Sequence, residues 1–482
     1  MAAVALGLSV FVLSEGICVL FDWGRPAEFD DPFVSFSAIH PLFTLNRDTG
    51  RYEIARSRRQ FFAAETFPAH KSSGTLRLFC LGGSTVQGRP FSKQTAFTTW
   101  LQLSLTTADP GRHWEVVNCG GISYASYRLV PILKECLQYE PDVFIICTGH
   151  NEFLEDRTYA AVKQASPAHR IVQETVGRMR TYQVLRSAVL TAARRGPRTN
   201  PPNIPLLKDD VDALLDYRNG LEAYHRDDRW RANVIDHFAF NLRRMISLAR
   251  GHSIPVILIR PPSNLRDSPP FKSQHRDGLT AAQLAEWRRL FRQARSHFKD
   301  DLARSIELLE RAARLDERYA AVWYELGRCY EARGCYTDAR RAFVKSRDED
   351  ICPLRIVTPM ERIIGTIAAE TGTPLVDAAA LLERQTSTGI LGGRLLADHV
   401  HPSIRGHQMI ADALTAMMIQ QGWVRPTAGW QDRRTKIYRA HFQSLEAIYF
   451  ARGRRELKNL DAWAHGRAEG PLLDPVPMVS GR

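Results

Sequence analysis

Five short apolar segments that alternate with helical patterns constrain the fold of this chain more than any other feature of its sequence. The apolar segments span residues 76–81, 115–118, 142–148, 255–260 and 373–377. Helical periodicity fills the intervals, for example over residues 127–137, 233–250 and 404–420. Short apolar strands that alternate with helices are typical of a parallel sheet with helices on both faces. The sequence therefore predicts an α/β fold around a five-stranded parallel sheet.

The composition of the 482 residues is that of a folded protein with a surplus of positive charge. The hydrophobic fraction is 44%, the charged fraction is 24% and the formal net charge is +13. This balance favours anionic partners, but the basic residues form no long run, and neither zinc-finger spacing nor an RNA-binding aromatic signature occurs. The eight cysteines include no CxxC pair of the metal-binding or redox type. We therefore expect no nucleic-acid partner, no metal and no cofactor.

The N-terminal residues 2–21 form an apolar stretch of about the length needed to cross a bilayer. Glu15 lies within it and is tolerated best near one edge of a membrane. The positively charged start and the cleavage site of a secretory signal peptide are absent. We expect an uncleaved membrane-anchor helix over residues 1–22, with a buried hydrophobic helix as the alternative. The flanking charges are too few to fix the orientation; we expect the folded domain on the extracytoplasmic, periplasmic side.

The long interval between the fourth and fifth apolar segments carries a repeat pattern. It matches the tetratricopeptide consensus at fixed offsets, with Trp323, Leu326, Gly327, Tyr330, Gly334, Tyr336, Ala339 and Phe343. Residues 34 positions earlier match the second helix of a preceding repeat in part. The sequence thus predicts a helical, tetratricopeptide-like insertion over 281–354. Its role stays open between a docking groove for a protein partner and a structural insertion.

These features divide the chain into five parts. The expected parts are an anchor over 1–22, an irregular segment over 23–75, the α/β domain over 76–280 and 355–422, the insertion over 281–354, and a C-terminal helix with a tail over 423–482. Within the last part, helical periodicity is clearest from residue 434 to residue 454.

Polar motifs follow the first three predicted strands. Gly82-Gly83-Ser84-Thr85 ends the first, residues 118–124 follow the second, and Gly149-His150-Asn151-Glu152 follows the third. Ligands of open parallel sheets bind outside the carboxyl ends of the strands, so a serine placed there by glycines stands at the rim. Alone, Gly-Gly-Ser-Thr is more typical of a turn or a phosphate cradle, although the Gly-Lys-Ser/Thr of a P-loop is missing. Asn151 can donate an N–H to a developing oxyanion, or it can cap a helix.

Asp398 and His401 lie three residues apart before the last predicted helix of the α/β domain. Within one turn the carboxylate can accept an imidazole N–H, which fixes the tautomer of the ring and raises its basicity. His399 and His407 crowd the same segment, so a metal site is the alternative, but no other cluster supplies the remaining ligands. Together the four segments offer a nucleophile, a base, an orienting acid and an oxyanion donor, which are the parts of acyl-transfer chemistry.

These four segments resemble the SGNH/GDSL hydrolase family. That family carries a serine after the first strand, a glycine after the second, Gly-x-Asn-Asp/Glu after the third and Asp-x-x-His near the end. The resemblance covers about 77–153 and 396–417. It implies a flavodoxin-like, three-layer α/β/α fold with a serine-hydrolase triad and an oxyanion hole. The implied triad is Ser84, His401 and Asp398, and the implied oxyanion donors are the backbone N–H groups of Ser84 and Gly121 and the side chain of Asn151.

Two departures separate the chain from the usual family pattern. Gly-Gly-Ser-Thr replaces Gly-Asp-Ser, and an ungapped count from Asn118 places the second oxyanion donor at Ser123 instead of Gly121. The Gly-Gly-Ser-Thr variant is similar to a branch with membrane-linked polysaccharide acetylesterases and acetyltransferase-like proteins. The resemblance implies a serine esterase acting on an acyl or acetyl ester of a small molecule or polysaccharide. An O-acyltransferase with the same residues, or a degenerate hydrolase that serves as an interaction module, are the alternatives.

Overall fold

The computed structural model describes residues 13–18, 20–21, 38–155, 179–181, 184, 206–207, 211–217 and 219–465. The chain divides into two compact units, one of residues 1–40 and 156–210, the other of residues 41–155 and 211–482. In the described part of the first unit, strand β1 (Ala38–Ile39) pairs in parallel with β8 (Leu206–Leu207). All elements discussed below belong to the second unit.

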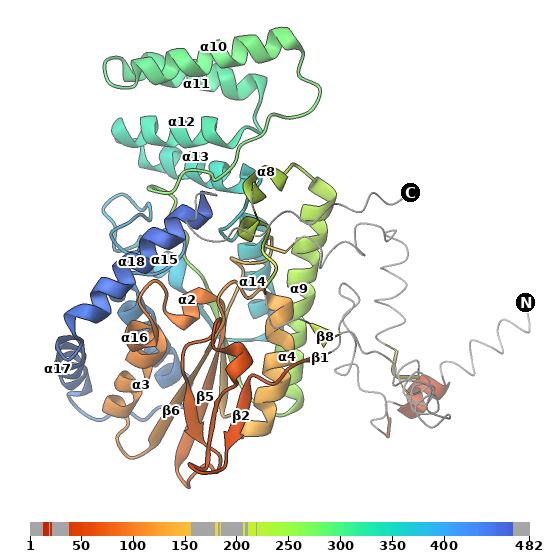
Figure 1. The fold of residues 1–482 in the computed structure, drawn as a ribbon, viewed down its shortest axis with the longest axis vertical. Coiled ribbons are helices and arrows are strands. Elements are labelled where there is room, and N and C mark those ends of the chain that lie inside the picture. The colour runs from red at the N-terminus through yellow and green to blue at the C-terminus, as the bar shows by residue number, and fades with distance from the viewer. Residues whose placement is uncertain are drawn as a thin grey trace, which may run out of the picture. The chain divides into compact units, whose positions relative to one another are not determined.

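The second unit is built on a five-stranded parallel sheet, which confirms the predicted α/β fold (Figure 1). Its strands are β5 (Thr75–Gly82), β6 (His113–Gly120), β7 (Val143–Cys147), β9 (Val256–Arg260) and β10 (Leu375–Asp377). Their order in the sheet is β10-β9-β7-β5-β6. Numbered along the chain, this is the 2-1-3-4-5 order of flavodoxin-like folds, in which ligands bind at the carboxyl edge where the strand order reverses.

Helices cover both faces of this sheet. One face packs against α3 (Phe97–Ala108) and α16 (Ile404–Gln420), and Leu78, Cys80 and Ile145 are buried in the shared core. The other face packs against α4 (Ser126–Cys136), α9 (Asp228–Gly251) and α14 (Thr358–Thr371). Strand side chains alternate between the two faces, so the continuous apolar runs of the sequence reflect burial on both sides. Shorter helices are α2 (Ser84–Gln87), α8 (Gly220–Ala223) and α15 (Ala378–Glu383).

A small antiparallel sheet precedes the main sheet and corrects the expectation of an irregular segment over 23–75. It consists of β2 (Phe43–Asn46), β3 (Arg51–Ile54) and β4 (Thr66–Pro68). The side chain of Asn46 closes the turn by accepting the N–H groups of Asp48 and Thr49. Strands of three or four residues contain too little alternation to stand out in a sequence.

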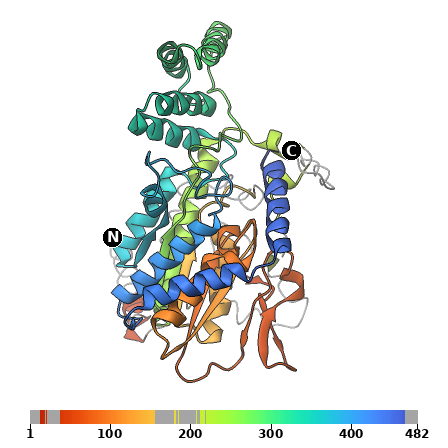
Figure 2. The same cartoon turned by 90° about the vertical axis from the view of Figure 1, so that its left-hand side faces the viewer.

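The segment between β9 and β10 contains two antiparallel helical hairpins, stacked one on the other in Figures 1 and 2. The first pairs α10 (Ala281–His297) with α11 (Leu302–Leu315), and the second pairs α12 (Ala320–Ala332) with α13 (Tyr336–Glu349). Gly327 lets α12 approach α13 closely, because a Cβ there would lie 2.6 Å from the ring of Phe343. The structure thus contains the predicted helical insertion, while its membership of the tetratricopeptide class stays a prediction.

Replacing Gly327 with alanine should loosen this hairpin. The added methyl group would overlap the buried ring of Phe343, so we expect the free energy of unfolding to fall by about 1–3 kcal/mol. Gly365→Ala is the matched control, because Gly365 lies in α14 and its Cβ would meet no atom within 4 Å. That change should stabilise by up to about 1 kcal/mol through helix propensity. Urea unfolding of both variants tests the pair, and equal effects would contradict the packing argument.

The carboxylate of Asp350 joins the two chain segments at which the helical insertion begins and ends. It accepts the backbone N–H groups of Phe271, Lys272 and Cys352 at 2.8, 3.1 and 3.0 Å. Burial raises the pKa of Asp350 to about 6, against the opposing effect of Arg355 and of these three hydrogen bonds. One side chain therefore joins the segment that enters the insertion to the segment that leaves it.

Two helices follow α16, where the sequence pattern suggested one. They are α17 (Trp430–Gln443) and α18 (Ala447–Ala464). Helix α18 packs on the loop after α2, since the Cβ of a residue in place of Gly453 would overlap the ring of Phe91. Glu456 of α18 also forms an ion pair with Arg89 in that loop.

The expected membrane anchor over residues 1–22 falls largely outside the described residues. In the part of the chain that the structure describes, no helix has the length and apolar character required for a membrane span.

Candidate active site

Ser84 is the first residue of α2, directly beyond the carboxyl end of β5. Two glycines permit this tight turn: a Cβ on Gly82 would lie 2.2 Å from the carbonyl oxygen of Cys147, and Gly83 is the N-cap. Asn118, at the end of β6, holds α2 in place by donating to the carbonyl oxygen of Val86 at 2.8 Å. The serine thus stands at the rim of the sheet, partly exposed.

A continuous chain of hydrogen bonds links Ser84, His401 and Asp398. The Oγ of Ser84 lies 2.7 Å from Nε2 of His401, and Nδ1 of His401 lies 2.6 Å from Oδ2 of Asp398. Because the carboxylate accepts a hydrogen bond from Nδ1–H, the proton stays on Nδ1 and Nε2 is left to accept the hydroxyl proton of Ser84. The imidazole of His401 is 3% exposed, so bulk water does not compete for either nitrogen. The structure therefore brings the serine together with a histidine that follows it 317 positions later in the sequence.

Asp398 is held as an ionised carboxylate. Burial acts to raise its pKa, but the charges of His401 and His399 and the hydrogen bonds from His401 outweigh that effect, so its pKa lies well below the ordinary value. Its Oδ1 accepts the N–H groups of Val400 and His401 at 2.9 and 2.8 Å. One oxygen thus fixes the backbone turn while the other orients the imidazole.

Asn264, in the loop after β9, clamps the turn that carries Asp398. Its side-chain amide donates to the carbonyl oxygen of Asp398 at 3.0 Å, and its backbone N–H donates to that of His399 at 2.9 Å. The buried guanidinium of Arg355 donates in turn to the carbonyl oxygen of Asn264 at 2.8 Å. Sequence reasoning did not select Asn264, although it lies at the carboxyl end of a predicted strand.

The donors available to an oxyanion lie around the turn at Gly83. The amide of Asn151 donates to the carbonyl oxygen of Tyr124 at 3.1 Å, which leaves its second N–H unassigned. A Cβ on Gly83 would lie 2.4 Å from Nδ2 of Asn151, so this amide sits directly beside the turn that carries Ser84. The N–H of Ser84 belongs to the first turn of α2, where helical N–H groups have no intrahelical acceptor.

The backbone N–H of Gly121 is not available as a donor in this conformation, which corrects the expectation for that residue. It donates to the carbonyl oxygen of Gly82 at 3.0 Å and so extends the pairing of β5 with β6. The N–H of Ser123 makes no hydrogen bond within the described part of the chain. Ser123 adopts a left-handed backbone conformation with φ 61°. Of the two positions left open by the sequence, the free N–H belongs to Ser123.

Glu152 anchors the loop that carries Asn151. Its buried carboxylate accepts the N–H and the hydroxyl of Ser126, both at 2.8 Å, at the start of α4. Burial raises its pKa, partly offset by these bonds. The glutamate of Gly-His-Asn-Glu therefore holds the loop in place, while the amide of the asparagine lies beside Gly83, the residue before Ser84.

Gly83→Ala tests the contact between this loop and the turn at Ser84. The methyl group would displace the amide of Asn151, and loss of one oxyanion donor costs roughly 10²–10³-fold in kcat. We expect kcat for ester hydrolysis to fall by about 10²-fold or more with the fold retained, as judged by circular dichroism. Gly365→Ala, which adds a methyl group in open space, should leave kcat unchanged. Full activity in Gly83→Ala would contradict the placement of Asn151.

Other imidazoles near the triad serve the structure. Nδ1 of His407 accepts the N–H of Phe97 at 3.1 Å, and Nδ1 of His150 accepts that of Ile356 at 3.0 Å. Burial lowers the pKa of His407 to about 3 and that of His399 to about 4, and it also lowers the pKa of His150. These rings are therefore neutral near pH 7. No group of three His, Cys, Asp or Glu residues in the described ranges is placed to hold a metal ion.

Two basic residues near the site are engaged elsewhere. Arg266 forms an ion pair with Glu331 of α12 at 2.8 Å. The ammonium group of Lys272 donates to three backbone carbonyl oxygens, those of Leu221, Glu222 and Tyr224, at 2.7–2.9 Å. Both side chains join the loop after β9 to neighbouring segments.

Comparison with known proteins gives only distant likenesses. No protein-family model and no curated protein matches the chain. Among solved structures, Axe2, an acetylxylan esterase from Geobacillus stearothermophilus, is 15% identical over 73% of this chain and 96% of its own, with a TM-score of 0.32. A lipase/acylhydrolase from Enterococcus faecalis is 12% identical over 73% of this chain and 100% of its own, with a TM-score of 0.33. Likenesses at this level do not establish an activity.

Proposed function

We propose that this protein is a serine esterase that hydrolyses acyl esters. The observation that supports the proposal is the unbroken hydrogen-bond chain from Ser84 through His401 to Asp398 at the carboxyl edge of the sheet. A serine hydroxyl is a weak nucleophile at neutral pH unless a base takes its proton. Here the base lies within hydrogen-bonding distance and its tautomer is set by a buried carboxylate, which meets the geometric requirement for nucleophilic catalysis.

The proposed reaction proceeds in two halves. His401 Nε2 takes the proton of Ser84 as Oγ attacks the ester carbonyl, and the carbonyl oxygen becomes an oxyanion that the N–H groups of Ser84 and Asn151 stabilise. His401 then returns the proton to the departing alcohol, which leaves an acyl-serine. In the second half, water loses a proton to His401 and attacks the acyl carbon. Collapse of that intermediate releases the carboxylic acid and restores the Ser84 hydroxyl.

Covalent labelling with a fluorophosphonate tests the proposal directly. The reagent phosphonylates activated serines, so mass spectrometry of the labelled full chain should place a single adduct on Ser84. Hydrolysis of short-chain p-nitrophenyl esters should disappear in step with labelling. An adduct on another serine, or ester hydrolysis that survives complete labelling, would overturn the assignment.

The finer parts of the proposal concern substrate, insertion and location. We propose an acyl or acetyl ester, on a small molecule or a polysaccharide, as substrate. Product analysis with an added polysaccharide acceptor separates hydrolysis from acyl transfer.

The close packing at Gly327 supports tetratricopeptide-like units in the insertion, which would dock a protein partner. Membrane anchoring through residues 1–22, with the catalytic unit on the periplasmic side, rests on the sequence pattern.

A further inference from the structure

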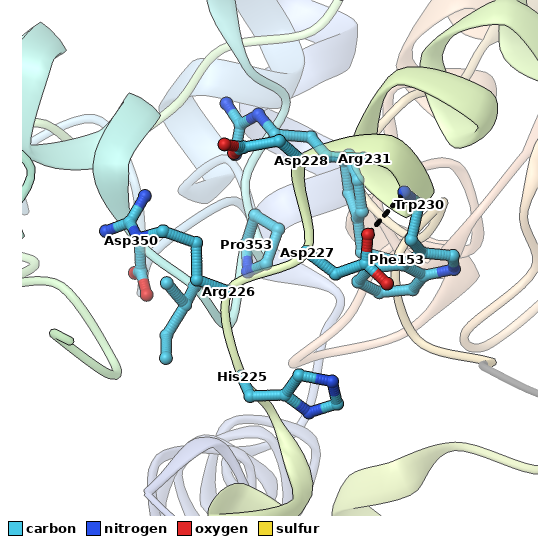
Figure 3. A pocket seen from close by; sticks show the side chains of 10 residues that line it. Phe153, His225, Arg226, Asp227, Asp228, Trp230, Arg231, Asp350 and Pro353 are labelled. Carbon is cyan, nitrogen blue, oxygen red and sulfur yellow. Dashed lines mark hydrogen bonds between the residues drawn. The ribbon is translucent and has the colours of Figure 1, made fainter. Parts of the chain in front are cut away.

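A small pocket lies where the start of α9 meets the end of the helical insertion (Figure 3). Its walls come from three segments: Phe153 beyond β7, residues 225–231 at the start of α9, and residues 350–353 after α13. None of the triad residues lines it. Its free volume is about 20 Å³, which admits one or two water-sized groups. A ligand could therefore place only one or two atoms inside the pocket, such as the oxygen atoms of a compact head group.

Arg231 is a cation of this pocket whose guanidinium forms no ion pair in the described part of the chain. Its side chain is partly buried and lies over the ring of Phe153, with 6.0 Å from Cζ to the ring centroid. Within the described ranges its guanidinium takes part in no hydrogen bond and no ion pair. Burial lowers its pKa, against the attraction of the carboxylates of Asp348, Glu349 and Asp228. A guanidinium offers five N–H donors, and leaving them without acceptors in a partly desolvated site is costly.

The acids that line the pocket are already engaged. Asp228, three residues before Arg231 on the same helix and so its expected partner, is taken by Arg318 through two hydrogen bonds of 2.7 and 2.5 Å. Asp350 accepts three backbone N–H groups from the segments that enter and leave the insertion. Asp227 accepts the N–H of Trp230 at 2.8 Å, the hydrogen bond drawn in Figure 3. Asp228 and Asp350 thus have other ion-pair partners, Arg318 and Arg355, and none of the three lining carboxylates, all within the described residues, forms an ion pair with Arg231.

Arg226 adds a second donor to the same pocket. Its two terminal nitrogens are occupied, one by Glu349 at 2.9 Å and the other by the carbonyl oxygens of Gln274 and Arg318. Its Nε is buried and has no hydrogen-bond partner in the described part of the chain. Two guanidinium groups thus bring N–H donors without acceptors to one compact space.

We propose that this pocket binds an oxyanion, either a carboxylate or a phosphate, through the guanidinium of Arg231 and Nε of Arg226. Oxyanions match the planar donor geometry of guanidinium, and charge-assisted hydrogen bonds of this kind are the strong ones. The pocket walls join Phe153 of the Asn151 loop to the segment after α13. The bound head group would therefore link the insertion to the α/β domain.

Differential scanning calorimetry of the full chain tests the proposal. Tm is measured at pH 7 with rising sodium phosphate or sodium acetate, while sodium chloride keeps the ionic strength constant. We expect a saturable rise in Tm with at least one of the two oxyanions, since a ligand that binds only the folded state stabilises it. A rise with phosphate alone identifies a phosphate site, and a rise with acetate identifies a carboxylate site. No saturable rise with either anion would overturn the proposal.

Variants on one helix supply the controls. Arg231→Gln should weaken anion binding by about tenfold or more, because a charge-assisted hydrogen bond is lost, and its Tm without added anion should stay level or rise as an unpaired charge is removed. Arg243→Gln, which breaks only the exposed pair of α9 with Glu370, should bind like the parent protein. Arg231→Lys keeps the positive charge but lacks the planar, paired N–H donors of guanidinium, so this variant should bind the anion with intermediate affinity. Equal binding by Arg231→Gln and Arg243→Gln would refute the site, whatever the enzymatic activity of the chain.

Discussion

Replacement of Ser84 by alanine should remove ester hydrolysis almost entirely. Its hydroxyl is the group that His401 Nε2 faces at 2.7 Å, so the variant keeps the base and the oxyanion donors but has no nucleophile. Loss of a triad nucleophile lowers kcat by roughly 10⁴–10⁶-fold. Steady-state hydrolysis of a p-nitrophenyl ester, with parent protein and variant at matched concentration, measures the difference.

The matched control for this change is Ser263→Ala. Ser263 is also a buried serine near the carboxyl edge of the sheet, and its Oγ has no partner in the described part of the chain. Removal of that hydroxyl breaks no hydrogen bond, so kcat should stay within about threefold of the parent value. If Ser84→Ala retained more than a few per cent of the activity, another residue would have to be the nucleophile.

Asp398→Asn should give the second large loss, of roughly 10³–10⁴-fold in kcat. The amide that replaces the carboxylate can donate to Nδ1 of His401, which places the imidazole proton on Nε2 and blocks proton uptake from Ser84. The variant should still fold, because the side chain keeps its size. Asp412→Asn, at a carboxylate of α16 that pairs with Arg434 at 3.1 Å, is the control and should retain kcat.

The free energy of unfolding should depend on pH in a way that reveals the lowered pKa of Asp398. The pKa of Asp398 is lower in the folded protein than its ordinary value near 4, so its ionised form stabilises the folded state above about pH 4. This contribution is lost as pH falls through the lowered pKa. The difference in free energy of unfolding between parent and Asp398→Asn should therefore shrink below about pH 4. A difference that stays constant down to about pH 2 would contradict a depressed pKa.

The parts of the fold that follow from burial were predictable from sequence. The central strands β7 and β9 are buried along almost their whole length and appear as continuous apolar runs, and all five strands of the main sheet, β5, β6, β7, β9 and β10, overlap the apolar segments of the sequence. Helix α16 begins and ends at the predicted residues 404 and 420. The small sheet of β2 to β4 left no comparable signal because its strands are short. The interruption between α17 and α18 was missed because helical periodicity continues across it.

The parts of the site that depend on backbone atoms were not predictable in the same way. The side chains of Ser84, Asp398 and His401 carry their chemistry in the residue type, so the four motifs taken together, with the family resemblance, were enough to select them as candidates. Asn264 acts on the carbonyl oxygen of Asp398, and no residue type marks that acceptor. For Gly121, the donor in question is a backbone N–H, and only the pairing of β5 with β6 shows that Gly82 has taken it.

The distance along the chain between Ser84 and His401 has a consequence for how the protein is made. The two residues are 317 positions apart, and ribosomes add roughly 5–20 residues per second. The serine therefore emerges roughly 15–60 s before the histidine to which it is hydrogen-bonded. The intervening hairpins α10 to α13 can form from neighbouring residues during that interval. If Ser84 is the nucleophile that we propose, each newly made molecule should stay inactive until the last strand and the Asp398 turn have joined the sheet.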